Sequence, residues 1–198
     1  MTQSQEAPFR GIQYVFLDRD GVINRKAPES QYIWQWDQFH LLTRADEAIA
    51  LLNRLGMRVI VVTNQRGVSR GLYRLDDVDA LHARLQEELG RVGGHIDAFY
   101  VCPHGGEECE CRKPKTGMMD QAFRDFPAAN KANSLLIGDS LSDMQLARAF
   151  GIPSILIRND DGDKERDRAD AEKLATGVSP SLFEAASVFL RPGVEDAE

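Results

Sequence analysis

The sequence is poor in sulfur, in long apolar runs and in positive charge. Its 198 residues include three cysteines, and 24 basic residues stand against 31 acidic ones, which gives a formal net charge of −7. No apolar run approaches the ~20 residues that a membrane-spanning helix needs. General nucleic-acid binding needs an excess of lysine and arginine to neutralise phosphates. We therefore expect neither a membrane nor a nucleic-acid partner.

The few cysteines and the start of the chain favour a reducing compartment. Three cysteines cannot all pair with one another, and MTQSQEAPFRG lacks the charged and then apolar pattern of a secretory signal. Hydrophobic residues make up 42% of the chain, which is enough for a substantial core. We expect a cytoplasmic protein with a single domain over 1–198, a core over about 12–160, and flexible ends at 1–10 and 191–198.

Apolar segments alternate with segments of helical periodicity along the chain. Strands are predicted over 12–18, 58–64, 96–102, 133–140 and 153–158, and helices over 45–56, 75–93, 116–126 and 141–151. Continuously apolar strands between helices are typical of a parallel sheet covered on both faces. The pattern predicts an α/β fold, a Rossmann-like three-layer sandwich with a mainly parallel sheet and no large cap domain.

Two smaller features have no clear link to chemistry. Trp34 and Trp36 alternate on an expected hairpin, and we expect them to pack against the sheet rather than to wall a site. The acidic run over 159–172 lacks the spacing of a calcium-binding loop, so we interpret it as a solvated surface.

Acidic residues follow two of the predicted strands. The segment DRDG places Asp18 and Asp20 after one strand, and GDSLSD places Asp139 and Asp143 after another. A lone DRDG segment is typical of a solvated turn, but parallel strands bring their carboxyl ends to one edge of the sheet. Carboxylates that meet there repel one another unless a cation lies between them, and oxygen ligands with an open position suit Mg²⁺.

The residues around this edge can also bind a phosphate. Thr63, Asn64 and Gln65 follow a strand and offer a hydroxyl and two amide groups, and Lys113 offers a positive charge. Phosphoryl transfer depends mainly on positioning and charge stabilisation. An aspartate can attack phosphorus, and a neighbouring acid can protonate the leaving oxygen and then activate water.

The four segments FLDRDG, VVTNQ, RKP and IGDSLSD resemble, in this order, the signature motifs of the haloacid dehalogenase (HAD) phosphatases. The resemblance covers about residues 12–160. It implies a HAD-like fold, with Asp18 as nucleophile, Asp20 as general acid/base, Thr63 as phosphate-binding hydroxyl and Lys113 as charge-stabilising group. It also implies a catalytic Mg²⁺ held by the Asp18 carboxylate, the Asp20 carbonyl and Asp139, with Asp143 supporting the site. We expect Asn64, Gln65, Arg70 and Arg112 to bind substrate, although Arg70 is as easily an ordinary surface arginine, and we interpret Arg66 as an ordinary surface arginine in preference to a substrate contact.

All three cysteines lie in one short loop, over 102–111. Cys102, His104, Cys109 and Cys111 form a C-x-H-x4-C-x-C pattern whose polar sequence argues against inert buried thiols. A redox pair usually has two intervening residues, and Cys109 and Cys111 have one. Four such ligands suit a closed, tetrahedral structural Zn²⁺, which would fix the loop that leads directly into Lys113.

A zinc loop before CRKP resembles the HAD subfamily that contains D-glycero-D-manno-heptose 1,7-bisphosphate phosphatases and histidinol-phosphate phosphatases. TNQRGVSRGLY and YIWQWDQFHLL resemble segments of the heptose enzymes. The loop between His104 and Cys109 is nearer the histidinol-phosphatase length, and NRKAPESQ over 24–31 differs from the D-H-G form of heptose enzymes. The resemblance implies a small phosphorylated sugar as partner.

We therefore expect a monomeric, Mg²⁺-dependent phosphomonoesterase that removes the 7-phosphate of D-glycero-D-manno-heptose 1,7-bisphosphate, within carbohydrate metabolism for lipopolysaccharide biosynthesis. Histidinol phosphate, or another small sugar phosphate, is the alternative substrate. An inactive, zinc-dependent interaction module is the alternative of another class, and the complete set of four motifs argues against it.

Overall fold

Six parallel strands form one sheet in the computed structural model, which describes residues 9–28, 30–106, 109–158 and 165–189. The strands are β1 (Tyr14–Leu17), β2 (Arg58–Asn64), β3 (Ala98–Cys102), β4 (Ser134–Gly138), β5 (Ser154–Ile157) and β6 (Gly177–Ser179). Their order is β3-β2-β1-β4-β5-β6, which is the doubly wound order of Rossmann-like folds. The predicted fold class is confirmed.

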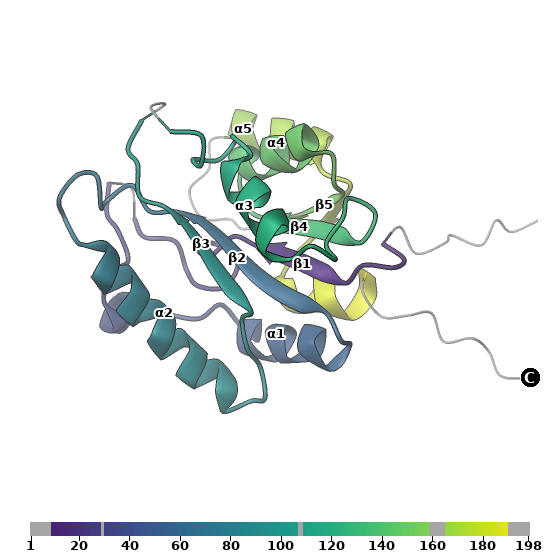
Figure 1. The fold of residues 1–198 in the computed structure, drawn as a ribbon, viewed down its shortest axis with the longest axis horizontal. Coiled ribbons are helices and arrows are strands. Elements are labelled where there is room, and N and C mark those ends of the chain that lie inside the picture. Colours follow the sequence, from purple (N-terminus) through teal and green to yellow (C-terminus); the bar gives the residue numbers. More distant parts are fainter. Residues whose placement is uncertain (1–8, 29, 107–108, 159–164, 190–198) are drawn as a thin grey trace, which may run out of the picture.

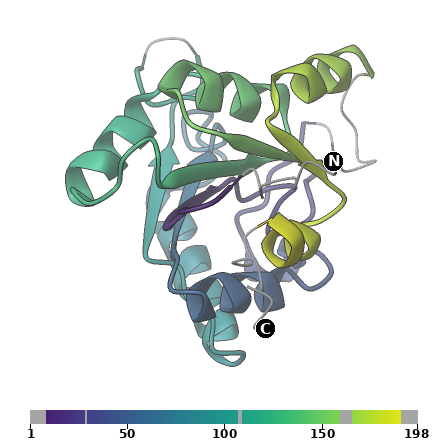
Figure 2. The same ribbon diagram turned by 90° about the vertical axis from the view of Figure 1, so that its right-hand side faces the viewer.

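Helices cover both faces of this sheet. They are α1 (Ala45–Arg54), α2 (Leu75–Gly90), α3 (Gly117–Asp125), α4 (Leu141–Phe150), α5 (Glu165–Leu174) and α6 (Leu182–Glu184), with a 3₁₀ turn η1 (Trp36–Gln38) and a π-helical turn η2 (Ala185–Phe189). Figure 1 shows α1 and α2 on one side of the strands and α3, α4 and α5 on the other. Figure 2 shows the C-terminal helix, in yellow, beside α1, in blue.

The central strand β1 shows why its sequence is continuously apolar. Val15, Phe16 and Leu17 are all fully buried. Val15 and Leu17 pack into the core under α1 and α2, and Phe16 packs on the opposite side with α3 and α4. Since successive side chains of a strand point to opposite faces, a strand covered on both faces needs apolar residues at every position.

The sheet also extends beyond the predicted core. Strand β6 pairs in parallel with β5, and α5 and α6 precede and follow it. Residues 159–164 of the acidic run lie outside the described residues. The helix α5 carries the rest of the run, with Ala171 buried, Asp167 exposed and Asp170 and Glu172 partly exposed. Strand β6 has three residues, which is too short for a reliable apolar pattern.

The segment between β1 and α1 differs from the expected hairpin. Trp36 begins the short turn η1, and no strand ladder among the described residues includes Trp34 or Trp36. The segment instead closes through a single antiparallel bridge between Asn24 and Leu41. Trp36 stacks on Phe39 with ring centroids 5.4 Å apart, so Trp36 makes a local aromatic contact where the expected hairpin would have paired strands.

The expected flexible ends lie almost entirely outside the described residues. Of 1–10 and 191–198, the structure describes only residues 9 and 10, and Phe9 is buried against the core rather than loose. Across the described ranges, none of the helices combines the length and the apolar character that a bilayer crossing requires.

Candidate active site

The acidic cluster lies where two neighbouring strands end. Strands β1 and β4 pair in parallel with Leu17 opposite Ile137, so Asp18, which follows Leu17, and Asp139, two residues after Ile137, leave the sheet near one another. Carboxylate oxygens of Asp18, Asp139 and Asp143 all lie within 4.8 Å of one another. The structure therefore brings together the acids from the first and fourth motifs.

Lys113 lies buried between two of these acids. Its Nζ is 2.8 Å from Asp18 Oδ1 and 2.7 Å from Asp143 Oδ1, and it donates a hydrogen bond to the Val62 carbonyl. Burial opposes the charge of this ammonium group, but the carboxylates of Asp143 and Asp18 outweigh burial and raise the pKa of Lys113 above its usual value. Lys113 thus stays positively charged beside Asp18.

Asp143 has a structural position as well as a charge. It lies in the first turn of α4, and its Oδ2 accepts hydrogen bonds from the backbone N–H and the hydroxyl of Ser140, the N-cap residue. A Cβ at Gly138 would lie 2.3 Å from the Asp143 Cβ, so the glycine allows this close approach. These contacts fit the expected supporting role.

The donor set suits a hard cation. Burial raises the pKa of Asp18 to about 6, with Lys113 opposing the shift and Asp143 adding to it. Burial likewise raises the pKa of Asp139 to about 8, against the opposing charge of Lys26. Crowded carboxyl groups of this kind favour a divalent ion that neutralises them, and carboxylate oxygens are the ligands that Mg²⁺ prefers. The residues present fit a magnesium site.

Asp20, two residues after Asp18, is held by several donors. Its Oδ2 is 2.9 Å from Arg19 Nη2, and its Oδ1 accepts a hydrogen bond of 2.8 Å from Asn24 Nδ2. Gln65 Nε2 donates to the Asp20 Oδ2 at 3.1 Å. The guanidinium of Arg19 is itself fully buried and donates to the Ile33 carbonyl. Asp20 therefore has a fixed orientation next to the acidic cluster.

The residues after β2 link the site together. Gln65 Nε2 donates to Thr63 Oγ1 at 2.9 Å as well as to Asp20, and Gln65 Oε1 accepts from the Tyr73 hydroxyl at 2.8 Å. The Asn64 side chain accepts from the Lys113 N–H and donates to the Lys113 carbonyl. Gln65 thus contacts Thr63 and Asp20, and Asn64 contacts the Lys113 backbone. The expected contacts of both amides with substrate stay predictions.

The cysteine loop begins at the end of β3 and passes beside the segment after β2. Gln65 N–H donates to the Cys102 carbonyl, and Ser69 N–H donates to the Pro103 carbonyl. A Cβ at Gly105 would lie 2.4 Å from Ser69 Oγ, so glycine permits this approach of the two loops. Residues 107 and 108 lie outside the described part of the chain.

The four expected zinc ligands converge. The Cys102 Sγ lies 3.7 Å from Cys109 Sγ, 3.0 Å from Cys111 Sγ and 3.8 Å from His104 Nδ1, and the His104 Nδ1 lies 3.2 Å from Cys111 Sγ. A tetrahedral Zn²⁺ with bonds of about 2.3 Å to sulfur separates its ligands by about 3.8 Å. The cluster is slightly tighter than this, and the four residues fit a closed zinc site.

A basic cavity of about 370 Å³ lies between the cysteine loop and Lys113. Four of its lining residues carry positive charge: Arg66, Arg112, Lys113 and Lys115. Arg112 also donates a hydrogen bond of 3.2 Å to the His104 carbonyl, which ties it to the cysteine loop. Arg70 is not among the lining residues of this cavity, and its Cζ lies 5.9 Å from the ring centroid of Tyr32. The expected contact between Arg70 and substrate stays a prediction.

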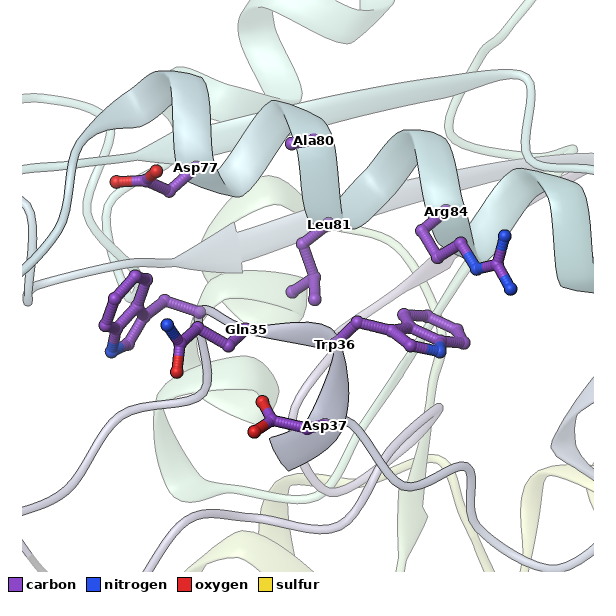
Figure 3. Close-up of a pocket in the computed structure, with 8 residues that line it drawn as sticks. Gln35, Trp36, Asp37, Asp77, Ala80, Leu81 and Arg84 are labelled. Atoms are coloured by element: carbon purple, nitrogen blue, oxygen red, sulfur yellow. The ribbon is translucent and has the colours of Figure 1, made fainter.

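A separate aromatic groove of about 640 Å³ runs between η1 and α2. Figure 3 shows Leu81 and Arg84 on α2, with Leu81 extending toward η1 and the Trp36 ring lying below Arg84. Trp34, which also lines this groove, stacks on Tyr73 at a centroid distance of 6.0 Å. The tryptophans therefore line the groove between η1 and α2, and neither belongs to the acidic cluster.

Sequence reasoning missed several residues of the site. Arg19 is the residue between the two aspartates of DRDG, and Asn24 and Lys26 lie in the segment that follows. Lys26 Nζ is 2.7 Å from Asp139 Oδ2. The segment over 24–31, which contains Lys26, differs from the D-H-G form of the heptose enzymes, and this difference was the sequence signal for Lys26. The sequence alone does not show which acid a lysine in a loop contacts.

Comparisons with known proteins agree with this geometry. The profile of the HAD-hydrolase-like family matches residues 110–185. A D-glycero-β-D-manno-heptose-1,7-bisphosphate 7-phosphatase of Pseudomonas aeruginosa is 38% identical over 149 residues, which is 75% of this chain and 82% of that protein. A D-glycero-α-D-manno-heptose-1,7-bisphosphate 7-phosphatase of Mycobacterium bovis is 43% identical over 134 residues, or 67% of this chain and 70% of that protein.

A solved structure shares the architecture over nearly its full length. The D,D-heptose 1,7-bisphosphate phosphatase of Bordetella bronchiseptica, complexed with magnesium and phosphate, superposes with a TM-score of 0.79 at 29% identity, covering 90% of this chain and 98% of that one. Magnesium and phosphate are thus both bound by a protein of this fold.

Proposed function

The chain belongs to the HAD-like hydrolase family and is a phosphatase, and from this premise we propose that it removes the 7-phosphate of D-glycero-D-manno-heptose 1,7-bisphosphate. The observation that carries the proposal is the position of Lys113. It contacts Asp18 within the acidic cluster and also lines the basic cavity. One phosphate can therefore lie at the acids while a second lies in the cavity.

Asp18 is the nucleophile in this proposal. Its carboxylate attacks the phosphorus of the 7-phosphate, and the bond from phosphorus to the sugar oxygen breaks, with its electron pair leaving on that oxygen. Asp20 gives its proton to the leaving oxygen. Asp20 then accepts a proton from water as the water attacks the aspartyl-phosphate, which frees inorganic phosphate and restores the Asp18 carboxylate.

The other residues orient and neutralise the reacting groups. Lys113 and the Thr63 hydroxyl contact phosphate oxygens, and Gln65 holds Thr63 and Asp20 in fixed relative positions. Asp18, Asp139 and the Asp20 carbonyl would hold Mg²⁺, which when bound supplies charge neutralisation for the phosphoryl group. Cys102, His104, Cys109 and Cys111 would hold a structural Zn²⁺ remote from bond breaking.

The second phosphate of the substrate is assigned to the basic cavity. Arg112 and Arg66 can each hold a phosphate bidentately, and Lys115 adds a further charge. Histidinol phosphate carries one phosphate only, so this cavity favours the bisphosphate. The relatives include enzymes named for either anomer of the heptose, and both anomers belong in the test.

The free cysteines bear on the compartment in which the enzyme works. The three cysteines are free thiols in the described structure, which suits zinc ligation in a reducing compartment such as the cytoplasm. We propose a monomer that supplies the heptose 1-phosphate for lipopolysaccharide biosynthesis.

A phosphate-release assay with Mg²⁺ tests the function. We expect a higher kcat/KM for the heptose bisphosphate than for histidinol phosphate. The kcat/KM for the bisphosphate should also exceed that for the heptose carrying only the 7-phosphate. Asp18→Asn should abolish turnover while the thermal unfolding midpoint stays close to wild type. Release of phosphate from histidinol phosphate alone would assign the rival substrate.

Variants of Arg112 test the assignment of the second phosphate. Arg112→Ala should raise KM for the bisphosphate by roughly tenfold, since a charged hydrogen bond contributes about 1.5–3 kcal/mol. It should change KM for the heptose 7-monophosphate much less. Arg124→Ala, on the exposed face of α3, is the matched control for loss of an arginine. An equal effect on both substrates would contradict the assignment.

A further inference from the structure

Lys26 places a second ammonium group in the acidic cluster. Its Nζ lies 2.7 Å from Asp139 Oδ2, and its side chain is 24% exposed, whereas the Asp139 side chain is fully buried. Lys26 comes from the segment after β1, so it reaches Asp139 from a part of the chain other than β4. It is not part of the four motifs that define the site.

Gly21 makes room for this contact. It has a φ of +96°, and a Cβ there would lie 1.8 Å from Asp139 Oδ2 and 2.8 Å from Lys26 Cε. The left-handed backbone and the missing side chain let both groups meet directly above Gly21. The contact between Lys26 and Asp139 is therefore built into the turn that follows Asp20.

The ammonium group of Lys26 and a magnesium ion need the same acid. Asp139 is one of three acids whose oxygens lie within 4.8 Å of one another, and Lys113 already pairs with the other two, Asp18 and Asp143. Three ionised carboxylates with Lys113 and a divalent ion are balanced in charge. Lys26 beside the same ion adds a repulsive positive charge at close range.

We propose that Lys26 competes with Mg²⁺ for Asp139 and so determines the affinity of the enzyme for its metal. The inference rests on the proposed function, because it needs the acidic cluster to be the magnesium site. Binding of Mg²⁺ is then an exchange in which the lysine side chain leaves the carboxylate. The released ammonium group remains beside the phosphate position, on a side chain that already reaches solvent.

Removal of the lysine charge should tighten metal binding. Lys26→Met keeps the length and apolar stem of the side chain but removes the ammonium group, so we expect the dissociation constant for Mg²⁺ to fall on the order of tenfold. Lys26→Arg keeps the charge and should bind Mg²⁺ like wild type. Lys173→Met removes another lysine paired with an aspartate, Asp170, on the exposed face of α5, and controls for net charge.

The measurement is the thermal unfolding midpoint across a MgCl₂ titration at constant ionic strength and pH, without phosphate. A ligand that binds the folded state raises this midpoint according to its affinity. The expected result is a titration for Lys26→Met that is shifted to lower Mg²⁺ concentration, with Lys26→Arg and Lys173→Met following wild type. Lys26→Gln provides a second uncharged variant if Lys26→Met folds poorly.

The outcomes separate the inference from the proposed function. An unchanged or weaker affinity in both uncharged variants, alongside normal Mg²⁺-dependent phosphate release by wild type, overturns the role of Lys26 alone. A wild-type protein that shows neither a Mg²⁺-dependent midpoint nor phosphate release overturns the metal site and the function together.

Discussion

At the residue scale, single side chains at this site serve two or more neighbours at once. Gln65 is the clearest case, because one amide group donates to Thr63 and to Asp20 and accepts from Tyr73. The side chain is buried, so each of these bonds forms where water competes poorly. Loss of the Tyr73 hydroxyl should therefore affect the acid/base, Asp20, through the Gln65 amide.

Tyr73→Phe tests this chain of contacts. It removes the hydroxyl that fixes Gln65 Oε1 and keeps the ring that stacks on Trp34. One hydrogen bond contributes about 1 kcal/mol, so we expect kcat to fall by roughly fivefold with little change in KM. Steady-state kinetics on the proposed substrate give both constants.

Tyr100→Phe is the matched control for Tyr73→Phe. It also loses a tyrosine hydrogen bond, from the hydroxyl to Asp125 Oδ2, at an exposed position away from Gln65. Its kcat should match wild type. Equal loss of kcat in the two variants would show that Tyr73 acts through stability rather than through Gln65.

His82 makes stability depend on pH. Burial, with a smaller contribution from Arg19 and against the opposing charge of Asp20, lowers the pKa of His82 from 6.5 to about 3. The ring stacks on Phe99, and its Nε2 lies 3.5 Å from Arg19 Nη1. Between pH 6.5 and 3 the unfolded state binds one more proton than the folded state, so His82 makes stability fall as pH falls through this window.

His82→Phe should remove that dependence and keep a ring against Phe99. The difference in unfolding free energy between the variant and wild type should shift in favour of the variant by up to about 1.4 kcal/mol per pH unit below pH 6.5. Urea unfolding at pH 7.5, 6.5 and 5.5 measures the difference. Parallel curves for the two proteins across these pH values would contradict the depressed pKa.

At the scale of single elements, the cysteine loop has little apolar surface of its own. It connects β3 to Lys113, with Cys102 buried in the core and Cys109 and Cys111 partly buried against it. Hydrogen bonds link other parts of the loop to its neighbours. Lys115 donates to the Cys109 carbonyl at 2.7 Å, and Arg112 donates to the His104 carbonyl. A bound metal would add the largest stabilising interaction in this loop.

Cys109→Ser should therefore reduce zinc content and stability more than it changes the chemical step. We expect less than one zinc per chain and a thermal midpoint lower by several degrees, since a weakened metal site costs folding free energy. Elemental analysis and a thermal scan give the two values. The idea of a structural zinc is wrong if wild-type protein carries no zinc and unfolds at the same temperature as the variant.

At the scale of the whole molecule, both helical layers share one sheet. Leu17 packs under α1 and α2 while Phe16 packs under α3 and α4, so neither layer can leave without exposing β1. The segment after β1 joins the same core through the buried side chains of Ile33 and Phe39. We therefore expect one cooperative unfolding transition.

The two tryptophans allow a direct test of that cooperativity. Trp34 and Trp36 are the only tryptophans of the chain, and both lie in the segment after β1. Tryptophan fluorescence therefore follows this segment, whereas far-UV circular dichroism follows the sheet and helices. Midpoints from the two signals should coincide in urea, and an earlier fluorescence transition would show that the segment unfolds independently.

The sequence predicted the parts of this protein that depend on local pattern. Strand β2 was expected over 58–64 and lies at Arg58–Asn64, because the continuous apolar run over 59–62 defines the centre of a buried strand well. Strand β6 and the turn at Trp36 were not predicted, because three-residue elements carry almost no periodic signal. Their conformations depend on the strand or ring they pack against.

By itself, the sequence determined the alternation of strands and helices along the chain as far as β5 and the identity of the acidic, cysteine and lysine candidates. These follow from apolar periodicity and from residue types at short spacings. Only the tertiary structure decided that Lys26 meets Asp139, that Gln65 bridges Thr63 and Asp20, and that Arg66 rather than Arg70 lines the basic cavity. Such contacts depend on where loops from different strands come together, and long side chains on loops carry no periodic pattern that would reveal their partners.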